Sequence, residues 1–168
     1  MFLDRDGTIN VPPPGGLYIR DPGQLELLPG AARAVRKINA SGALAVLFSN
    51  QRWLSRPAVT TIAFTALHDR LGELLGEAGA RLDACYVCPH EVGACDCRKP
   101  AAGMLRRAAA ELGIDLRRSV AIGDSPSDVA AGRAAGTRCA LLGDPALAAL
   151  AAPDAVFSDL EQAVAWAL

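Results

Sequence analysis

Three apolar residues run directly into a polar cluster in the stretch MFLDRDGT, residues 1–8. Two other short apolar runs, at residues 44–48 and 120–122, end in the same way. Such runs alternate with helical patterns along the chain, and this alternation predicts βαβ units. We therefore expect an α/β fold of the Rossmann-like type, with a mostly parallel sheet and helices on both faces. The predicted strands are residues 1–3, 44–48, 84–87, 120–122, 139–142 and 155–157.

The helical patterns lie between these apolar runs. Residues 30–40, 104–112 and 126–135 are predicted helices, and each is followed by a glycine where a left-handed C-terminal cap would lie. The longest helix is predicted to start near Pro57. Its apolar residues recur at steps of three and four, which is typical of a helix face that packs on a core. These residues are Phe64, Leu67, Leu71, Leu74 and Ala78.

The composition predicts one globular domain, residues 1–168. Apolar residues make up 51% of the chain and charged residues 21%, which is too apolar for a disordered protein. The 17 basic and 18 acidic residues nearly cancel, and without a basic stripe we expect no nucleic-acid partner. No uncharged apolar run reaches the roughly 18 residues of a membrane span, so we expect no membrane partner and a cytoplasmic location. The oligomeric state is left open.

Three aspartates at strand ends form the first candidate site. Asp4 and Asp6 are two residues apart, so an extended chain would point both carboxylates to one side and Arg5 to the other. Asp124 follows another strand, and ligands of open α/β sheets bind beyond the carboxyl ends of the strands. Carboxylates that are held together favour a hard divalent cation. Asp128 has two interpretations, a member of this acidic set or a cap of the following helix.

Four ordered motifs contain these aspartates and their expected neighbours. They are Asp4-Arg5-Asp6-Gly7-Thr8, Ser49 after an apolar strand, Lys99 in Cys97-Arg98-Lys99-Pro100, and Gly123-Asp124-Ser125-Pro126-Ser127-Asp128. Together they resemble the motifs of the haloacid dehalogenase-like phosphohydrolases. The resemblance implies that Asp4 is a nucleophile, that Asp6 is a general acid and base, and that Ser49 and Lys99 hold the transferring phosphoryl group. It also implies a catalytic Mg²⁺ ion bound by Asp4, the Asp6 carbonyl and Asp124.

Four of the five cysteines fall within thirteen residues, which indicates a metal site rather than disulfides. Cys88 with His90, and Cys95 with Cys97, form two pairs of potential ligands that a four-residue loop joins. Three sulfurs and one imidazole would fill a tetrahedral, structural Zn²⁺ site. Cys85 competes with His90 for this role, but on a predicted strand it faces the opposite side from Cys88. The alternative is a group of reduced structural cysteines, with His90 at the surface or on a phosphate.

This cluster narrows the resemblance to the zinc-bearing branch of the family. Cys88-Pro89-His90 followed by Cys95-Asp96-Cys97-Arg98-Lys99-Pro100 is similar to the branch of heptose bisphosphate and histidinol-phosphate phosphatases, and FLDRDGTIN at residues 2–10 favours the heptose group. The implied partner is a small phosphorylated sugar, with histidinol phosphate or another small metabolite as the alternative. A nucleic-acid end-processing or binding module is disfavoured by the balanced charge. A non-catalytic scaffold is disfavoured because all four motifs are present.

Asn50, Arg52 and Arg98 are the predicted substrate-binding residues. A second phosphate needs its own cations, and guanidinium groups bind phosphate by paired hydrogen bonds. Arg98 adjoins Lys99 and the predicted zinc loop, residues 88–97, whereas Arg56 is a third candidate or a solvated surface residue.

The segment 52–57 departs from the family pattern because it contains no glycine. Trp53 within it is either a stacking platform for a sugar or a hydrophobic anchor at the helix entrance. No insertion between the motifs is large enough for a separate cap domain, so we expect an open site.

Overall fold

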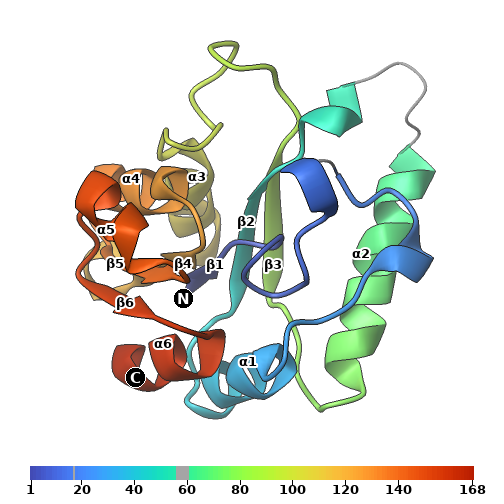
Figure 1. Cartoon of the computed structure of the whole chain (residues 1–168), viewed down its shortest axis with the longest axis horizontal. Coiled ribbons are helices and arrows are strands. Elements are labelled where there is room, and N and C mark those ends of the chain that lie inside the picture. The colour runs from blue at the N-terminus through green and yellow to red at the C-terminus, as the bar shows by residue number, and fades with distance from the viewer. Residues whose placement is uncertain (17, 56–60) are drawn as a thin grey trace.

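The computed structural model describes residues 1–16, 18–55 and 61–168. The described residues form one sheet of six strands in the order β3-β2-β1-β4-β5-β6, and its five strand pairs are parallel (Figure 1). The predicted Rossmann-like α/β fold is therefore confirmed. The strands are β1 (Phe2–Leu3), β2 (Val46–Asn50), β3 (Ala84–Cys88), β4 (Val120–Gly123), β5 (Arg138–Leu142) and β6 (Ala155–Phe157).

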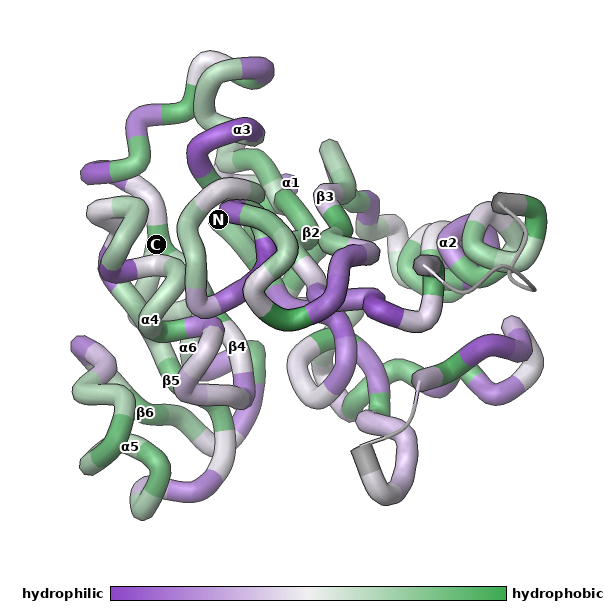
Figure 2. The backbone as a smooth tube through the Cα atoms, turned by 90° about the horizontal axis from the view of Figure 1, so that it is seen from above, coloured by the Kyte–Doolittle hydropathy of each residue, from purple (hydrophilic) through white to green (hydrophobic). Residues whose placement is uncertain are grey.

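Within the described ranges, six α-helices cover the two faces of the sheet. They are α1 (Ala31–Ala40), α2 (Thr61–Gly76), α3 (Gly103–Leu112), α4 (Pro126–Ala135), α5 (Pro145–Ala151) and α6 (Leu160–Ala167). Short 3-10 helices lie at η1 (Pro14–Gly16), η2 (Pro22–Gln24), η3 (Arg52–Ser55) and η4 (Leu116–Arg118). Helices α1, α2 and α6 share one apolar cluster, whereas α3, α4 and α5 pack on the other face. Figure 2 shows α5 and β6 as mostly hydrophobic segments, in line with their common cluster.

The central strand β1 is buried on both faces. Its residue Phe2 packs in the cluster of α3 and α4, while Leu3 packs in the cluster of α1 and α2. Successive residues of a strand point to opposite faces, so two apolar residues are enough to bind both layers. The main-chain N–H of Asp4 still donates to the Ile122 carbonyl, so the ladder reaches the first acidic residue.

The helix predictions agree with the structure except near α2. Residues 126–135 form a helix as predicted, and the glycines that follow three predicted helices have positive φ angles. The stripe on α2 buries Leu67 and Leu71, and Leu75 is buried with them. Ala78 lies beyond the end of α2, so its place in the stripe was wrong. The predicted start near Pro57, like Arg56, falls outside the described residues.

Strand β2 lies two residues further along the chain than predicted. Ser49 pairs with Val87 and Asn50 pairs with Cys88, so both polar residues belong to the strand instead of following it. The prediction ended the strand where the apolar run stops, but the hydrogen-bond ladder to β3 continues past it. In the described ranges, no helix combines the length and the apolar character that a membrane crossing requires.

Candidate active site

The site lies where the order of the strands reverses. From β1 the chain proceeds to β2 and β3 on one side, and from β4 to β5 and β6 on the other. Asp4 follows β1 and Asp124 follows β4, and these two strands are neighbours. Such a switch point is where open α/β sheets bind ligands.

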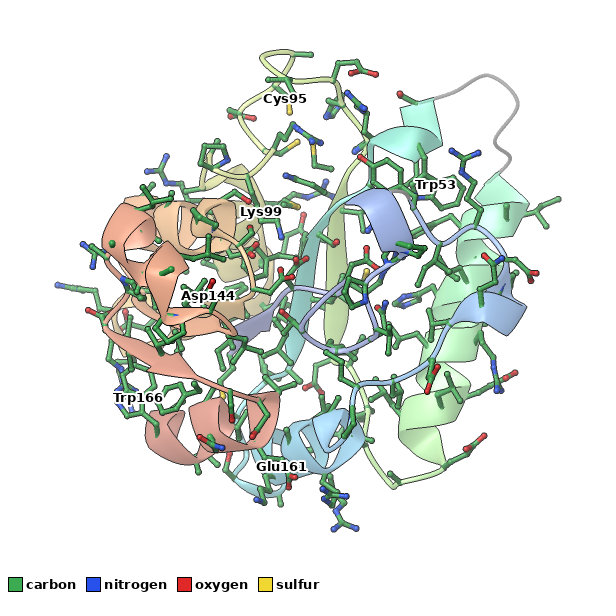
Figure 3. The ribbon with its side chains drawn as sticks, in the orientation of Figure 1. Trp53, Cys95, Lys99, Asp144, Glu161 and Trp166 are labelled. Atoms are coloured by element: carbon green, nitrogen blue, oxygen red, sulfur yellow. The ribbon has the colours of Figure 1, made fainter. Side chains whose placement is uncertain are left out.

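Lys99 is a buried cation that contacts two carboxylates of the site. Its Nζ lies 2.8 Å from Asp4 Oδ1 and 2.5 Å from Asp128 Oδ1, and it donates to the Phe48 carbonyl at 3.2 Å. Figure 3 shows Lys99 at the centre of the molecule, and the residue is 5% exposed. Burial alone would lower the pKa of Lys99, but the two carboxylates together raise it. Lys99 is therefore a fixed positive charge.

Three carboxylates meet around this lysine. Oxygens of Asp4, Asp124 and Asp128 all lie within 4.8 Å of one another. Burial raises the pKa of Asp4 to about 7, with Asp128 adding to the effect and Lys99 opposing it. Burial and then the charge of Asp128 raise the pKa of Asp124 to about 6. The raised pKa values show that the ionised carboxylates lack compensating charge, and carboxylate oxygens are ligands that Mg²⁺ prefers, so these residues fit such an ion.

Asp128 combines the two interpretations that the sequence left open. Its Oδ2 accepts from the main-chain N–H of Ser125 at 3.0 Å and from the Ser125 hydroxyl at 2.8 Å, which caps α4. Its Oδ1 forms the ion pair with Lys99. A single carboxylate thus fixes the start of α4 and faces the site.

Three residues donate hydrogen bonds to the Asp6 carboxylate. Arg5 donates through Nε to Oδ1 at 3.2 Å and through Nη2 to Oδ2 at 2.9 Å. Asn10 Nδ2 donates to Oδ1, and Gln51 Nε2 donates to Oδ2, each at 3.0 Å. The prediction that Arg5 points away from the carboxylates was wrong for Asp6, because a buried guanidinium needs a charged partner.

Ser49 and Asn50 approach the site from β2. Ser49 is buried, and its Oγ accepts from Gln51 Nε2 at 2.9 Å. Asn50 donates through Nδ2 to the Lys99 carbonyl and accepts at Oδ1 from the Lys99 N–H, both at 3.1 Å. In this structure the Asn50 amide therefore positions the main chain of Lys99.

The predicted zinc ligands gather in one cluster. Cys88 Sγ lies 3.6 Å from His90 Nδ1 and 3.5 Å from Cys95 Sγ. Cys97 Sγ lies 3.3 Å from His90 Nδ1 and 3.2 Å from Cys95 Sγ. Atoms that share a tetrahedral Zn²⁺ at about 2.0–2.3 Å lie about 3.4–3.8 Å from one another. The four distances of 3.2, 3.3, 3.5 and 3.6 Å are close to this range, and three thiols with one imidazole are a ligand set of structural zinc, so the four residues fit the ion. Figure 3 shows Cys95 on the loop above the sheet.

Cys85 lies on the opposite face of β3 from Cys88, as predicted. Cys85 packs against the cluster of α1 and α2, whereas Cys88 is buried in the cluster of α3 and α4. Burial raises the pKa of the Cys85 thiol to about 11. The strand geometry therefore keeps Cys85 out of the cluster, and His90 is the fourth candidate ligand.

The zinc loop contacts both described arginines that were predicted to bind substrate. Arg98 Nη1 donates to the His90 carbonyl at 3.3 Å, and Arg52 Nη1 pairs with Glu91 Oε2 at 3.2 Å. Both guanidinium groups are partly exposed. Trp53 is 1% exposed, so its indole ring offers no free face on which a sugar could stack. This burial supports the anchor interpretation.

A cavity of about 490 Å³ adjoins Asp124 on the side of β5 and β6. Gly7 and Thr8 line it together with the segments that follow these two strands. Among the described residues that line it there are aspartates but neither lysine nor arginine. This cavity is thus unlike the side of the zinc loop, where the arginines lie.

Comparison with known proteins agrees with this geometry. Residues 96–163 match the family described as HAD-hydrolase-like. The chain is 39% identical to the D-glycero-D-manno-heptose-1,7-bisphosphate 7-phosphatase of Thermosynechococcus vestitus, over 99% of this chain and 93% of that protein. This chain belongs to the haloacid dehalogenase-like hydrolase family.

Other members of this hydrolase family are similar as well. The D-glycero-beta-D-manno-heptose-1,7-bisphosphate 7-phosphatase of Pasteurella multocida is 36% identical over 80% of this chain and 76% of its own length. The crystal structure of D,D-heptose 1,7-bisphosphate phosphatase from B. bronchiseptica, complexed with magnesium and phosphate, superposes with a TM-score of 0.89 at 31% identity. It covers 99% of this chain and 96% of its own. The motif resemblance seen in the sequence is thus confirmed for the hydrolase family.

Sequence reasoning did not find three residues of the site. Arg5, Asn10 and Gln51 all bind Asp6, yet none was assigned a role there. The stretch Asp4-Arg5-Asp6 offered one signal, because an arginine between two aspartates at a buried strand end must find a partner among them.

Proposed function

We propose that this hydrolase is a Mg²⁺-dependent phosphatase that removes the 7-phosphate of D-glycero-D-manno-heptose 1,7-bisphosphate. The observation that carries the proposal is the buried contact of Lys99 with Asp4 and Asp128, next to Asp124, at the switch point of the sheet. The names of its relatives support the substrate. Histidinol phosphate is the alternative substrate.

The acidic group supports Mg²⁺ as the cofactor. Asp4, Asp124 and the Asp6 carbonyl are the proposed ligands, and Asp128 supplies a further oxygen nearby. When bound, the ion neutralises negative charge on the phosphoryl group and on the departing oxygen. Lys99 and Ser49 would hold the phosphoryl oxygens, and Lys99 already holds Asp4 in place.

Two carboxylates carry the proposed chemistry. Asp4 attacks phosphorus, the bond from phosphorus to the sugar oxygen breaks, and an aspartyl phosphate forms. Asp6 gives its proton to the departing sugar oxygen. Asp6 then takes a proton from water, the water oxygen attacks phosphorus, and the bond from phosphorus to the Asp4 oxygen breaks. Inorganic phosphate departs, and the Asp4 carboxylate is restored.

The remote phosphate belongs on the side of the zinc loop in this proposal. Arg98 and Arg52 lie there, whereas the described lining of the cavity beside Asp124 offers no cation. A structural Zn²⁺ on Cys88, His90, Cys95 and Cys97 would fix the loop against which Arg98 rests. We also propose that residues 1–168 act as a single domain without a separate cap, so the site stays open to a small substrate.

A phosphate-release panel tests the proposed function. Purified protein with Mg²⁺ is given the heptose bisphosphate, histidinol phosphate and a 5′-phosphorylated oligonucleotide. We expect the highest kcat/KM on the heptose bisphosphate, and no turnover by Asp4→Asn because the nucleophile is absent. Near wild-type release by Asp4→Asn would refute the nucleophile, and preference for histidinol phosphate would refute the sugar substrate.

Arg98 gives this proposal a test at one residue. Arg98→Ala should lower kcat/KM for the bisphosphate at least tenfold more than for a matched monophosphate, because binding energy from the phosphate that does not react is lost. Arg117→Ala is the control, since Arg117 is 91% exposed on η4 and outside the site. Equal losses on both substrates would place Arg98 at the reacting phosphate or in the fold.

A further inference from the structure

Gln51 is a buried amide with all of its side-chain hydrogen bonds filled. Its Nε2 donates to Asp6 Oδ2 at 3.0 Å and to Ser49 Oγ at 2.9 Å. Its Oε1 accepts from Trp53 Nε1 at 2.7 Å and from Arg5 Nη2 at 3.2 Å. The side chain is fully buried, so water does not replace any of these partners.

These four partners allow one orientation of the amide. If the amide were flipped, its NH₂ group would face the Trp53 and Arg5 donors, and its oxygen would face the Asp6 carboxylate. Both contacts would then be unfavourable, and buried polar groups without partners are costly. The main chain of Gln51 is fixed too, because its N–H donates to the Cys88 carbonyl at 2.8 Å.

The amide reaches both functional groups at once. Gln51 donates to Oδ2 of Asp6 and Asn10 donates to Oδ1, while Arg5 donates to both oxygens, so the carboxylate has a fixed plane. Because Gln51 donates to Ser49 Oγ, the Ser49 proton is left for another acceptor, such as a phosphoryl oxygen. One side chain thereby fixes the positions of both the Asp6 carboxyl, the proposed proton donor, and the Ser49 hydroxyl, the proposed phosphate-binding group.

Trp53 is part of the segment without glycine that distinguishes this chain. It lies on η3, and its indole N–H makes the shortest of the four bonds to Gln51. Tryptophan has only this donor, and burying it requires an acceptor. The amide of Gln51 is that acceptor.

We propose that Gln51 is a positioning residue for Asp6 and Ser49, and that Trp53 sets the orientation of the Gln51 amide. The inference rests on the proposed function, in which Asp6 protonates the leaving oxygen. Misplacement of a catalytic group by about 1 Å costs about 10²-fold in rate. The cost is largest for a poor leaving group, because a good one departs without a proton from Asp6.

The leaving group therefore separates a positioning role from a structural one. An alkyl phosphate that the wild type hydrolyses and p-nitrophenyl phosphate, an aryl ester, are compared for each variant. Gln51→Glu keeps both accepted bonds and removes both donated ones. We expect it to lower kcat/KM, which covers the steps up to departure of the alcohol and not the hydrolysis of the shared aspartyl phosphate, about 10²-fold on the alkyl ester and at least tenfold less on the aryl ester.

Trp53→Phe provides the second variant, because it keeps an aromatic ring and removes the N–H. We expect a loss of kcat/KM of several-fold, again larger on the alkyl ester. Two matched controls should change neither rate: Trp166→Phe on α6, at the other end of the molecule from Trp53 (Figure 3), and Gln162→Glu, whose Nε2 also donates to a serine and an aspartate but at the surface.

The ratio of the two rates does not depend on the amount of folded enzyme. Equal losses on both esters, or unchanged rates in Gln51→Glu, would overturn the positioning role while the proposed function stands. If the wild type hydrolysed no alkyl phosphate, including the heptose bisphosphate, the proposed function would fail and the positioning role would fail with it.

Discussion

Gly7 packs directly against the carboxylate of Asp124, which leaves no space for a side chain. Its φ angle is +83°, and a Cβ built there would overlap the carboxylate of Asp124. A side chain at this position therefore meets two obstacles, a left-handed backbone and an occupied space. The motif needs glycine here because the chain turns directly beneath a carboxylate of another strand.

Gly7→Ala should reduce both stability and Mg²⁺ affinity. The left-handed conformation costs about 1–2 kcal/mol with a Cβ present, and Asp124 must also move. Gly42→Ala is the control, because Gly42 has a φ of +78° with no heavy atom within 4 Å of the new Cβ. Both variants should lose stability in urea, but the Mg²⁺ requirement of phosphate release should rise only in Gly7→Ala. A similar rise in Gly42→Ala would assign the effect to the fold.

The pKa of Asp4 predicts how stability depends on pH in protein without Mg²⁺. Burial raises this pKa to about 7, whereas the pKa of an aspartate in the unfolded chain is about 3.9. Between these values the native state binds more protons, so the free energy of unfolding falls as pH rises from about 4 to about 7. Asp124, with its pKa raised to about 6, acts in the same direction.

Urea denaturation at pH 5.5 and pH 8 measures this effect. Wild type should lose more stability between the two than Asp4→Asn, which lacks the titrating carboxylate. Magnesium is removed by dialysis so that zinc stays in place, and added Mg²⁺ should abolish the difference because a bound cation favours the ionised carboxylates. Identical pH dependence in the two proteins would contradict the prediction.

The sequence predicted residues of the site by strand-end position, and failed where side chains from different strands bond to each other. Asp4 and Asp124 meet because parallel strands end at one edge, which periodicity reveals. The bond between Gln51 and Asp6 depends on how two loops turn after their strands, and no spacing rule encodes it. Arg5 was misplaced for the same reason, since the chain leaves the extended form after Asp4.

At the scale of elements, the zinc loop joins the end of β3 to the start of α3. Its four candidate ligands come from the last residue of β3 and from the loop, residues 89–97, so they tie an edge strand to a segment without regular structure. The spacing of ligands predicted this cluster well, because each pair lies within three residues. The end of β2 was predicted poorly, because its last residues, Ser49 and Asn50, are polar.

His90→Ala should lose zinc, whereas Cys85→Ser should keep it. His90 Nδ1 lies among the sulfurs of the cluster, while Cys85 packs on the other face of β3. Thiolate and imidazole ligands hold zinc through dialysis, but oxygen ligands release magnesium. Elemental analysis of reduced, dialysed protein measures both ions. If Cys85→Ser lost zinc and His90→Ala kept it, Cys85 and not His90 would be the fourth ligand. If the wild type contained no zinc, the four residues would be a group of reduced structural cysteines with a histidine.

At the scale of the whole molecule, the site lies at the carboxyl ends of the central strands, and much of the core lies between the sheet and its helices away from the site. All six strands of the described residues were predicted, because each contains a short apolar run. Helices α5 and α6 were not given bounds, although Asp144 with Pro145 and Asp159 cap their first turns. Leu75 belongs to the part of the core at the far end of α2, and it is fully buried.

Leu75→Ala should separate stability from catalysis. Removal of a buried leucine side chain costs about 2–5 kcal/mol, and kcat should stay within twofold of wild type because Leu75 is near the end of α2 that leads into β3. Leu150→Ala is the control, since Leu150 is 79% exposed on α5 and should change stability by less than about 0.5 kcal/mol. Urea unfolding and phosphate release measure the two effects, and a fall in kcat at full folding would show that this end of the core reaches the site.

The placement of the two tryptophans has an optical consequence. Trp53 is enclosed at the site, while Trp166 stacks under Arg138 at the other end of the sheet and is partly exposed. Intrinsic fluorescence is therefore a sum of a blue-shifted, quencher-resistant emission from Trp53 and a red-shifted, quenchable emission from Trp166. In Trp166→Phe the remaining tryptophan emission comes from Trp53 alone. Its wavelength therefore reports local opening of the site separately from unfolding of the rest of the chain.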